Sequence, residues 1–307
     1  MNAIALSLLA AIFIWGSNNA ATKYLVQSWP PLFIGFTRFF GAGVILLGLL
    51  RIMPRLGPIH TLDAPLRKRL WWEGSVNLGL YIISFNLALA YTSASHVALY
   101  MGAAPVWALV AEGRPRMTWV SLKAYGAALL ALAGVVILFW PALHAGGTVW
   151  VGELIGLACS VFWTHYGRHC RAFRDVLSSA EISAHTFVRG SLLVAPFALV
   201  EAVLYFRQHG ISPLLDPKLI GIQTYSTLFS GVLAFLIWNN ALRVWPVSKV
   251  YLFNNLIPLS TMLWAHFLIN EPITATFWPA MGLIIGGVLM GQTRWEAVLG
   301  KRFFPGE

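Results

Sequence analysis

Residues 86–105, NLALAYTSASHVALYMGAAP, are matched 153 positions later by residues 239–258, NNALRVWPVSKVYLFNNLIP. The two stretches share an asparagine at the start, a serine in the middle and a proline at the end. Further pairs follow at this or slightly different offsets, and self-similarity over such a distance predicts two homologous halves. The paired positions are Asn86 and Asn239, Ala88 and Ala241, Leu89 and Leu242, Ser95 and Ser248, Val97 and Val250, Pro105 and Pro258, Gly134 and Gly287, Trp15 and Trp163, and Arg38 and Arg189.

The composition predicts an integral membrane protein. Of 307 residues, 58% are hydrophobic and only 10% are charged, whereas a soluble domain is about 25% charged. So little charge cannot cover a surface that faces water, which excludes an ordinary soluble enzyme, a disordered chain and a collagen-like fibre. The apolar runs are continuous rather than alternating, so we expect spanning helices and not a β-barrel.

Breaks at charged residues, Pro and Gly divide the chain into ten predicted spans. Five fall in the first repeat, 1–142, and five in the second, 147–293, with 294–307 as a cytoplasmic tail. Because five is odd, the second repeat enters the membrane inverted, an arrangement typical of alternating-access transporters with a central site between the halves. The predicted spans are 3–25, 32–52, 70–91, 93–111, 120–140, 151–171, 181–206, 218–242, 247–269 and 273–293.

The basic residues predict the orientation. Sixteen of the 21 Lys and Arg residues fall in alternate loops and the tail, three fall on the opposite side, and Arg38 and Arg189 lie inside spans. The positive-inside rule then places both termini in the cytoplasm. The net charge of +10 therefore needs no nucleic-acid partner. The two cysteines, Cys159 and Cys170, lie too far apart on one helix for a disulfide and do not form a metal cluster.

Polar and aromatic residues inside the spans are the candidates for substrate contact, since polar groups in a bilayer need a partner or a wet cavity. Aromatic faces suit a ring or a cation, and amides suit the ammonium and carboxylate of an amino acid. Helix packing, interfacial belts and helix–helix hydrogen bonds explain the same residue types equally well. The candidates are Trp15, Asn18, Tyr81, Asn86, His96, Tyr100, Trp163, His165, Tyr166, Trp238, Asn239, Tyr251 and Asn254, with Pro105 and Pro258 as hinges.

Three further expectations concern charged and small residues. Arg38 and Arg189 are expected to be structural, with a role in holding a substrate carboxylate as the alternative. His96 and His165 are proton carriers or satisfied buried histidines. Gly282-x-x-x-Gly286 on the tenth span allows close helix contact, as do Gly126 and Gly134 on the fifth. These two helices are therefore expected to form the scaffold or the face of a homodimer.

Several motifs resemble the EamA family of the drug/metabolite transporter superfamily. The residues are Ile14 to Asn19 with Lys23, Pro30-Pro31 with Arg38, Pro258, Asn270-Glu271-Pro272, and Gly282, Gly286 and Gly287. The first half departs from the pattern, because Thr118 stands at the position that matches Glu271. The many Trp and Tyr residues are most similar to YddG-type exporters of aromatic amino acids. The resemblance implies a multi-pass carrier of a bacterial inner membrane, with ten helices around a central cavity and no cofactor.

The sequence therefore predicts a secondary transporter that exports aromatic or bulky hydrophobic amino acids, and quaternary ammonium compounds as a further cargo. A carrier of phosphorylated or nucleotide-linked metabolites is the alternative, and it would need several Lys or Arg at the cavity. A membrane-embedded enzyme is disfavoured, because no HExxH, GxSxG or P-loop motif occurs and no catalytic or metal-binding residue is indicated. An assembly protein would not explain the inverted duplication. The expected partners are a small-molecule substrate and the lipid bilayer.

Overall fold

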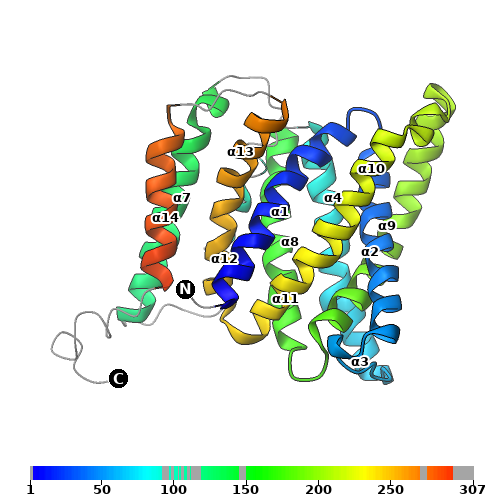
Figure 1. Cartoon of the computed structure of the whole chain (residues 1–307), viewed down its shortest axis with the longest axis horizontal. Helices are drawn as coiled ribbons and strands as arrows, with labels where there is room; N and C mark the ends of the chain where they lie inside the picture. Colours follow the sequence, from blue (N-terminus) through cyan, green and yellow to red (C-terminus); the bar gives the residue numbers. More distant parts are fainter. Residues whose placement is uncertain are drawn as a thin grey trace.

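The computed structural model (Figure 1) describes residues 3–91, 97, 100–102, 104, 107–108, 111, 119–144, 150–269 and 275–292. These residues form helices joined by short turns, with no strand among them. The helices are α1 (Ala3–Leu25), α2 (Pro31–Ile52), η1 (Pro54–Leu56), α3 (Ala64–Arg69), η2 (Leu70–Ser75), α4 (Val76–Tyr91), α7 (Trp119–His144), α8 (Trp150–Ala172), α9 (Ser179–His209), η3 (Ser212–Leu215), α10 (Pro217–Tyr225), η4 (Ser226–Leu233), α11 (Ala234–Val244), α12 (Val247–Tyr251), η5 (Leu252–Leu256), α13 (Ile257–Ile269) and α14 (Phe277–Gln292).

Five described helices are long and apolar enough to cross a membrane, and two shorter apolar stretches, Ser121–Gly134 and Phe277–Gly291, accompany them. The helical class is thus confirmed for the described residues, the length and composition of the helices support membrane spans, and the count of ten spans stays a prediction. The predicted span 93–111 falls outside the described residues except for single positions. The five long helices are Ala3–Leu25, Pro31–Ile52, Ala64–Tyr91, Ser179–His209 and Pro217–Val244.

Helix ends follow capping chemistry. Helix α9 begins at Ser179 rather than at the expected residue 181, because Ser178 and Glu181 form a reciprocal capping box. It ends at His209 and is followed by the C-cap residue Gly210, whose positive φ of 75° suits glycine. The Glu201 carboxylate on α9 accepts the backbone N–H of Leu32 at 2.7 Å, so one membrane carboxylate serves to cap α2.

Three predicted spans are continuous in the sequence pattern but change helix type in the structure, among them the span expected over 70–91, which consists of η2 and α4. The span expected over 247–269 consists of α12, the 3₁₀ segment η5 and α13. Pro258 has no N–H to donate, and the Asn254 carbonyl accepts from Ile257 instead. The span expected over 218–242 contains the π-helical segment η4, and η2 is a π-helical segment next to α4. Such segments occur often at functional sites.

Figure 1 shows how the helices are arranged. Helices α7 and α14 pair at one side, where a Cβ on Gly134 would lie 2.8 Å from the Ala280 carbonyl and one on Gly287 would lie 2.8 Å from that of Ala127. Gly282, part of the expected contact motif, has open space around it. Helices α3–α4 and α7 run upward in the view, and α10–α11 and α14 run downward.

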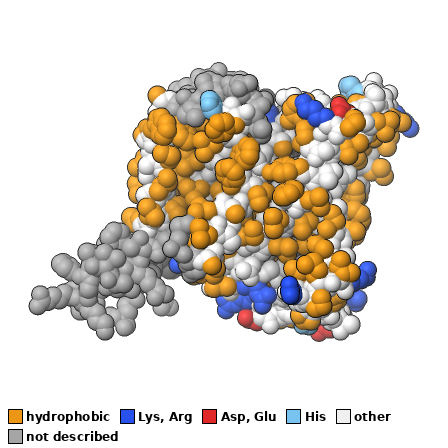
Figure 2. Space-filling view, viewed as in Figure 1, with side chains coloured by type: hydrophobic (Ala, Val, Ile, Leu, Met, Phe, Trp, Pro, Cys, Tyr) orange, Lys and Arg blue, Asp and Glu red, His pale blue; other side chains and the backbone are white. Residues whose placement is uncertain are grey.

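The surface carries an apolar band and one basic end. In Figure 2 hydrophobic side chains cover the middle of the molecule, and Lys and Arg gather mainly at the lower end. The basic last turn of α3, Arg67 to Arg69, belongs to this lower end. By the positive-inside rule this end is predicted to face the cytoplasm.

The tight contact between α2 and α9 provides a test of the fold. A Cβ on Gly43 would lie 2.9 Å from the Val188 backbone nitrogen, whereas one on Gly48 would meet nothing within 4 Å. We expect Gly43→Ala to destabilise the protein by about 1–3 kcal/mol through overpacking. Gly48→Ala should be neutral or slightly stabilising, because alanine has the higher helix propensity. Thermal unfolding in detergent checks both, and equal midpoints for the two variants would contradict the packing.

Candidate functional site

A cluster of aromatic rings occupies the centre of the molecule, and Trp163 of α8 lies in its middle. The Trp163 ring centroid is 5.5 Å from that of Trp15, 5.1 Å from that of Tyr81 and 5.6 Å from that of Trp238. Separations of this size are the preferred range for aromatic pairs. The cluster joins α1, α4, α8, α11 and α12. We call it the central ring cluster; its members are Trp15, Tyr81, Trp163, Tyr166, Phe235, Trp238 and Tyr251.

Local backbone features hold these rings in place. The indole Nε1 of Trp15 donates to the Ser230 carbonyl in η4 at 3.2 Å. The Tyr251 hydroxyl donates to the Trp163 carbonyl on α8. A Cβ on Gly167 would lie within 3.0 Å of three atoms of the Tyr251 side chain, so glycine is needed for this ring to reach α8.

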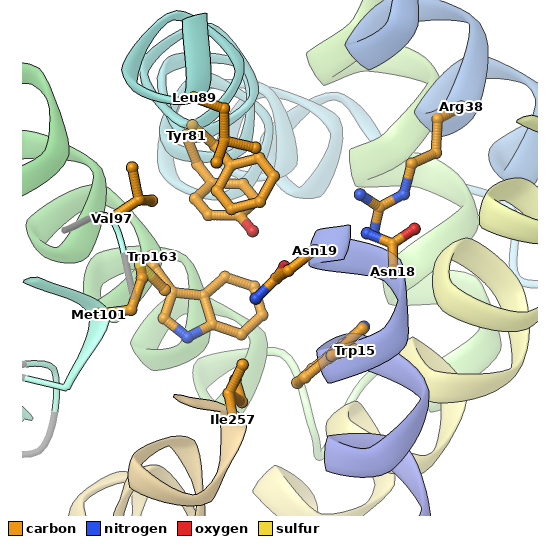
Figure 3. Close-up of a pocket in the computed structure, with 11 residues that line it drawn as sticks. Trp15, Asn18, Asn19, Arg38, Tyr81, Leu89, Val97, Met101, Trp163 and Ile257 are labelled. Atoms are coloured by element: carbon orange, nitrogen blue, oxygen red, sulfur yellow. The ribbon is translucent and has the colours of Figure 1, made fainter. Parts of the chain in front are cut away.

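A small cavity lies against the central ring cluster (Figure 3). Its open volume is about 40 Å³, far below the roughly 300–1,000 Å³ of ordinary ligand pockets. The cavity holds a few water molecules at most in this conformation. It is lined by Trp15, Asn18, Asn19, Arg38, Tyr81, Phe85, Leu89, Val97, Met101, Trp163 and Ile257.

The polar lining of the cavity is only partly satisfied. Arg38 donates from Nη2 to the Ser230 hydroxyl at 2.7 Å, and Asn18 donates to Thr22 Oγ1 at 3.3 Å. Asn19 donates to Thr261 Oγ1 at 3.3 Å. Three buried atoms of the lining have no hydrogen-bond partner: Arg38 Nε, Asn18 Oδ1 and Trp163 Nε1. Figure 3 shows Arg38 and Asn18 pointing toward one another at one edge.

The candidate residues from the sequence separate into groups. Four line the cavity, namely Trp15, Asn18, Tyr81 and Trp163. Three more belong to the central ring cluster but lie outside the lining, namely Tyr166, Trp238 and Tyr251, and all three are fully buried.

Other candidates lie elsewhere. Asn239 on α11 donates to Ser183 Oγ on α9 at 2.7 Å and so links two helices. Asn86 donates to the Ile82 carbonyl of its own helix at 2.8 Å. Asn254 is fully buried with neither amide atom paired.

The remaining candidates lie away from the cavity or outside the description. His165 is part-exposed and stacks on His169, away from the cavity lining. Tyr100 lies against α8, where a Cβ on Gly156 would meet its ring at 2.8 Å. His96 and Pro105 lie outside the described residues.

The sequence predicts a structural role for Arg38, with the binding of a substrate carboxylate as the alternative, and it does not place Asn19 or Ser230 among the candidate site residues. The structure places Arg38 and Asn19 in the cavity lining and Ser230 behind it. Asn19 belongs to the first-helix motif, which was a usable signal. Ser230 had none, because its position depends on the π-helical geometry of η4.

A second, larger cavity of about 820 Å³ lies beside the first, between α1, α10 and α13. Ser17, Lys23 and Tyr24 of α1 line it, so α1 carries the central cavity on one face and this lateral groove on another. The groove is larger, but the unpaired buried lining atoms and the central ring cluster make the central cavity the better candidate site. Among the residues with described placement, no three His, Cys, Asp or Glu side chains gather in metal-binding proximity.

The family model described as the EamA-like transporter family matches residues 2–140 and 150–291. The chain belongs to this family. The two matched segments fall on the two halves predicted from the internal repeat.

Relatives of the chain are also transporters. The uncharacterized transporter YetK of Bacillus subtilis is 24% identical over 92% of this chain and 85% of its own. The uncharacterized inner membrane transporter YedA of Escherichia coli is 26% identical over 97% of this chain and 92% of its own. A solved crystal structure matches with a TM-score of 0.72 and 19% identity over 98% of both chains, which supports the fold. The chain is therefore a membrane transporter of the EamA family.

The contrast between two buried asparagines yields a prediction. Asn254→Leu removes an amide with no partner, so we expect unfolding stability in detergent to stay constant or to rise by about 1–3 kcal/mol. Asn239→Leu removes the donor to Ser183 Oγ and should lower stability. The thermal unfolding midpoints of the two variants give the comparison. An equal loss in both would show that Asn254 has a partner in the folded protein.

Proposed function

We propose that this EamA-family protein exports aromatic or bulky hydrophobic amino acids by alternating access, with quaternary ammonium compounds as a further cargo class. The proposal is supported mainly by the lining of the central cavity, whose walls include the rings of Trp15, Tyr81 and Trp163. The amides of Asn18 and Asn19 also line it. A flat ring fits between such walls, and amide dipoles suit the charged groups of an amino acid. The aromatic faces also suit a cationic head group. A bacterial inner membrane with cytoplasmic termini is the proposed location.

The lining disfavours a phosphorylated cargo. Recognition of a phosphate usually employs several converging Lys or Arg side chains, and among the described residues of the cavity lining Arg38 is the one Lys or Arg. Lys249 instead lies over the Trp245 ring, 4.4 Å from its centroid. Arg243 lines a separate recess of about 430 Å³ together with Arg55 and Arg174.

The position of the central ring cluster supports an alternating-access mechanism. The cavity is lined by Phe85 and Leu89 in the last two turns of α4, toward the end opposite the basic one. Trp238 and Tyr251 lie closer to the basic end of the molecule, on α11 and α12. The rings therefore close the path on the predicted cytoplasmic side, and their separation would open it.

The helix breaks supply places where such a motion can occur. Helices α12 and α13 are joined by η5 just before Pro258, the proposed hinge, and η4 interrupts α10–α11 behind the cavity. The opposed directions of α3–α4 and α10–α11 support the inverted relation between the two halves. Rocking of the halves about these segments would enlarge the cavity from its closed volume.

Counterflow in proteoliposomes tests the proposal. Vesicles preloaded with unlabelled tryptophan should take up labelled phenylalanine saturably. Excess aromatic amino acid should block uptake, methyl viologen should compete, and alanine and triose phosphate should not. Trp163→Ala should reduce uptake about tenfold or more, because the ring lies at the centre of the cluster.

Trp278→Ala is the matched control, since its side chain on α14 is 63% exposed and does not line the cavity. It should retain wild-type uptake. Absence of aromatic uptake by the wild type, together with uptake of another cargo, would overturn the substrate assignment. Trp163→Phe distinguishes loss of the wall from loss of folding, because it keeps an aromatic ring at the site.

A further inference from the structure

The Arg38 guanidinium lies at the edge of the cavity, and none of the described residues supplies a counter-ion to it. Its side chain sits on α2 and is only 4% exposed. Of its five N–H donors, the structure assigns a hydrogen bond to Nη2 alone, which donates to the neutral Ser230 hydroxyl. The Nε atom is buried and unpaired, and the Phe39 ring lies 4.8 Å from the guanidinium carbon.

No carboxylate that the structure describes neutralises this charge. None lines the cavity, and the ion pairs in the described part of the chain involve other cations. Glu201, which lies on the neighbouring helix α9, instead binds the backbone at the start of α2. The acidic side chains described are Asp63, Glu73, Asp175, Glu181, Glu201 and Asp216.

A buried charge of this kind needs a compensating partner. Removing a guanidinium from water without an opposite charge is strongly unfavourable, and one hydroxyl compensates only a part of that penalty. Charged groups inside membrane proteins therefore mark substrate or ion paths more often than scaffold. An anion that enters the cavity would supply the missing charge, and a planar carboxylate matches the two parallel donors of a guanidinium.

We propose that Arg38 binds the carboxylate of the transported amino acid and so makes the carrier prefer cargo that has a carboxylate over cargo that lacks one, such as a quaternary ammonium compound. This inference rests on the proposed function and narrows its substrate class. The carboxylate meets Arg38 at the edge of the cavity, where Asn18 also points (Figure 3). The unpaired Asn18 Oδ1 accepts from the ammonium group, and the ring lies against Trp15 and Trp163.

The second half of the chain contains a natural comparison. Arg189 on α9 corresponds to Arg38 in the internal repeat, yet it is part-exposed and donates to the His185 carbonyl of its own helix at 3.2 Å. It does not line the cavity. The two halves therefore differ at this position, and one of the two paired arginines faces the transported molecule.

The test compares tryptophan with tryptophanamide, which replaces the carboxylate by a neutral amide of similar shape. In wild-type proteoliposomes, tryptophanamide should inhibit labelled tryptophan counterflow about tenfold less well than unlabelled tryptophan does. Arg38→Gln should raise the KM for tryptophan and abolish the preference for tryptophan over tryptophanamide. Arg38→Lys, which retains the charge but lacks the fork, should show an intermediate preference. Arg189→Gln should behave as the wild type.

A structural role for Arg38 would produce a different result. In that case Arg38→Gln would lower the amount of folded protein or the maximal rate, while the folded variant kept its tenfold preference for tryptophan over tryptophanamide. That outcome overturns the proposal. Gel filtration and thermal unfolding show which variants are folded. If Arg38→Gln does not fold, the preference of Arg38→Lys decides, and a wild-type preference there overturns the proposal.

A ligand-binding measurement distinguishes failure of aromatic amino acid transport from failure of the Arg38 carboxylate site. If the wild type does not transport tryptophan, the thermal stabilisation of the protein in detergent is measured with acids and with their amides. The pairs are indole-3-acetate and indole-3-acetamide, phenylacetate and phenylacetamide, and lactate and lactamide. Stabilisation by an acid alone, lost in Arg38→Gln and kept in Arg189→Gln, retains the carboxylate site while the aromatic cargo fails. No preference for any acid in the wild type overturns the Arg38 proposal.

Discussion

Contact among the aromatic rings around Trp163 is the interaction on which the rest of the molecule depends. This one side chain on α8 meets rings from α1, α4, α11 and α12. In a lipid bilayer the hydrophobic effect does not drive helices together, so packing between large buried surfaces and close backbone approach must hold the bundle. The central ring cluster supplies the large surface, Gly43 allows the backbones of α2 and α9 to approach, and Gly167 leaves room for the Tyr251 ring against α8. The cavity remains small because these rings fill the space.

Polar groups in the bundle show which parts are scaffold and which are site. Groups with hydrogen-bond partners on another helix, such as the Asn239 Nδ2 donor and the Glu201 carboxylate, link neighbouring helices and cap their ends. Buried groups that lack partners include Arg38 Nε and Asn18 Oδ1, and both belong to the cavity lining. Since an unpaired polar group in an apolar medium is unfavourable, its presence at a cavity indicates that another molecule completes it.

Much of this architecture can be predicted from the sequence. Apolar runs locate the long helices, and the internal repeat pairs Trp15 with Trp163, which meet in the centre. The rotation of each helix is harder, because neighbouring residues differ by about 100° around the axis. His165 and Tyr166 are adjacent in sequence, yet Tyr166 is fully buried and His165 is part-exposed.

The changes of helix type also escape prediction from sequence. Nothing in the pattern of residues 226–233 indicates a π-helix, although this segment presents both the carbonyl bound by Trp15 and the hydroxyl bound by Arg38. Proline gave a partial signal, since Pro258 marks the place where η5 replaces a continuous helix. The role proposed for Arg38 depends on the lack of a neighbouring carboxylate among the described residues, which follows from the packing of the helices and not from any local motif.

The binding of an aromatic amino acid in the central cavity is tested most directly by locating the bound molecule in a crystal. Crystals of the protein grown with 5-bromotryptophan would reveal the bromine by its anomalous scattering. We expect a single bromine in an enlarged cavity between Trp15, Tyr81 and Trp163, with the carboxylate at Arg38. Bromine in the lateral groove along α10, or no ordered bromine at saturating ligand, would contradict it.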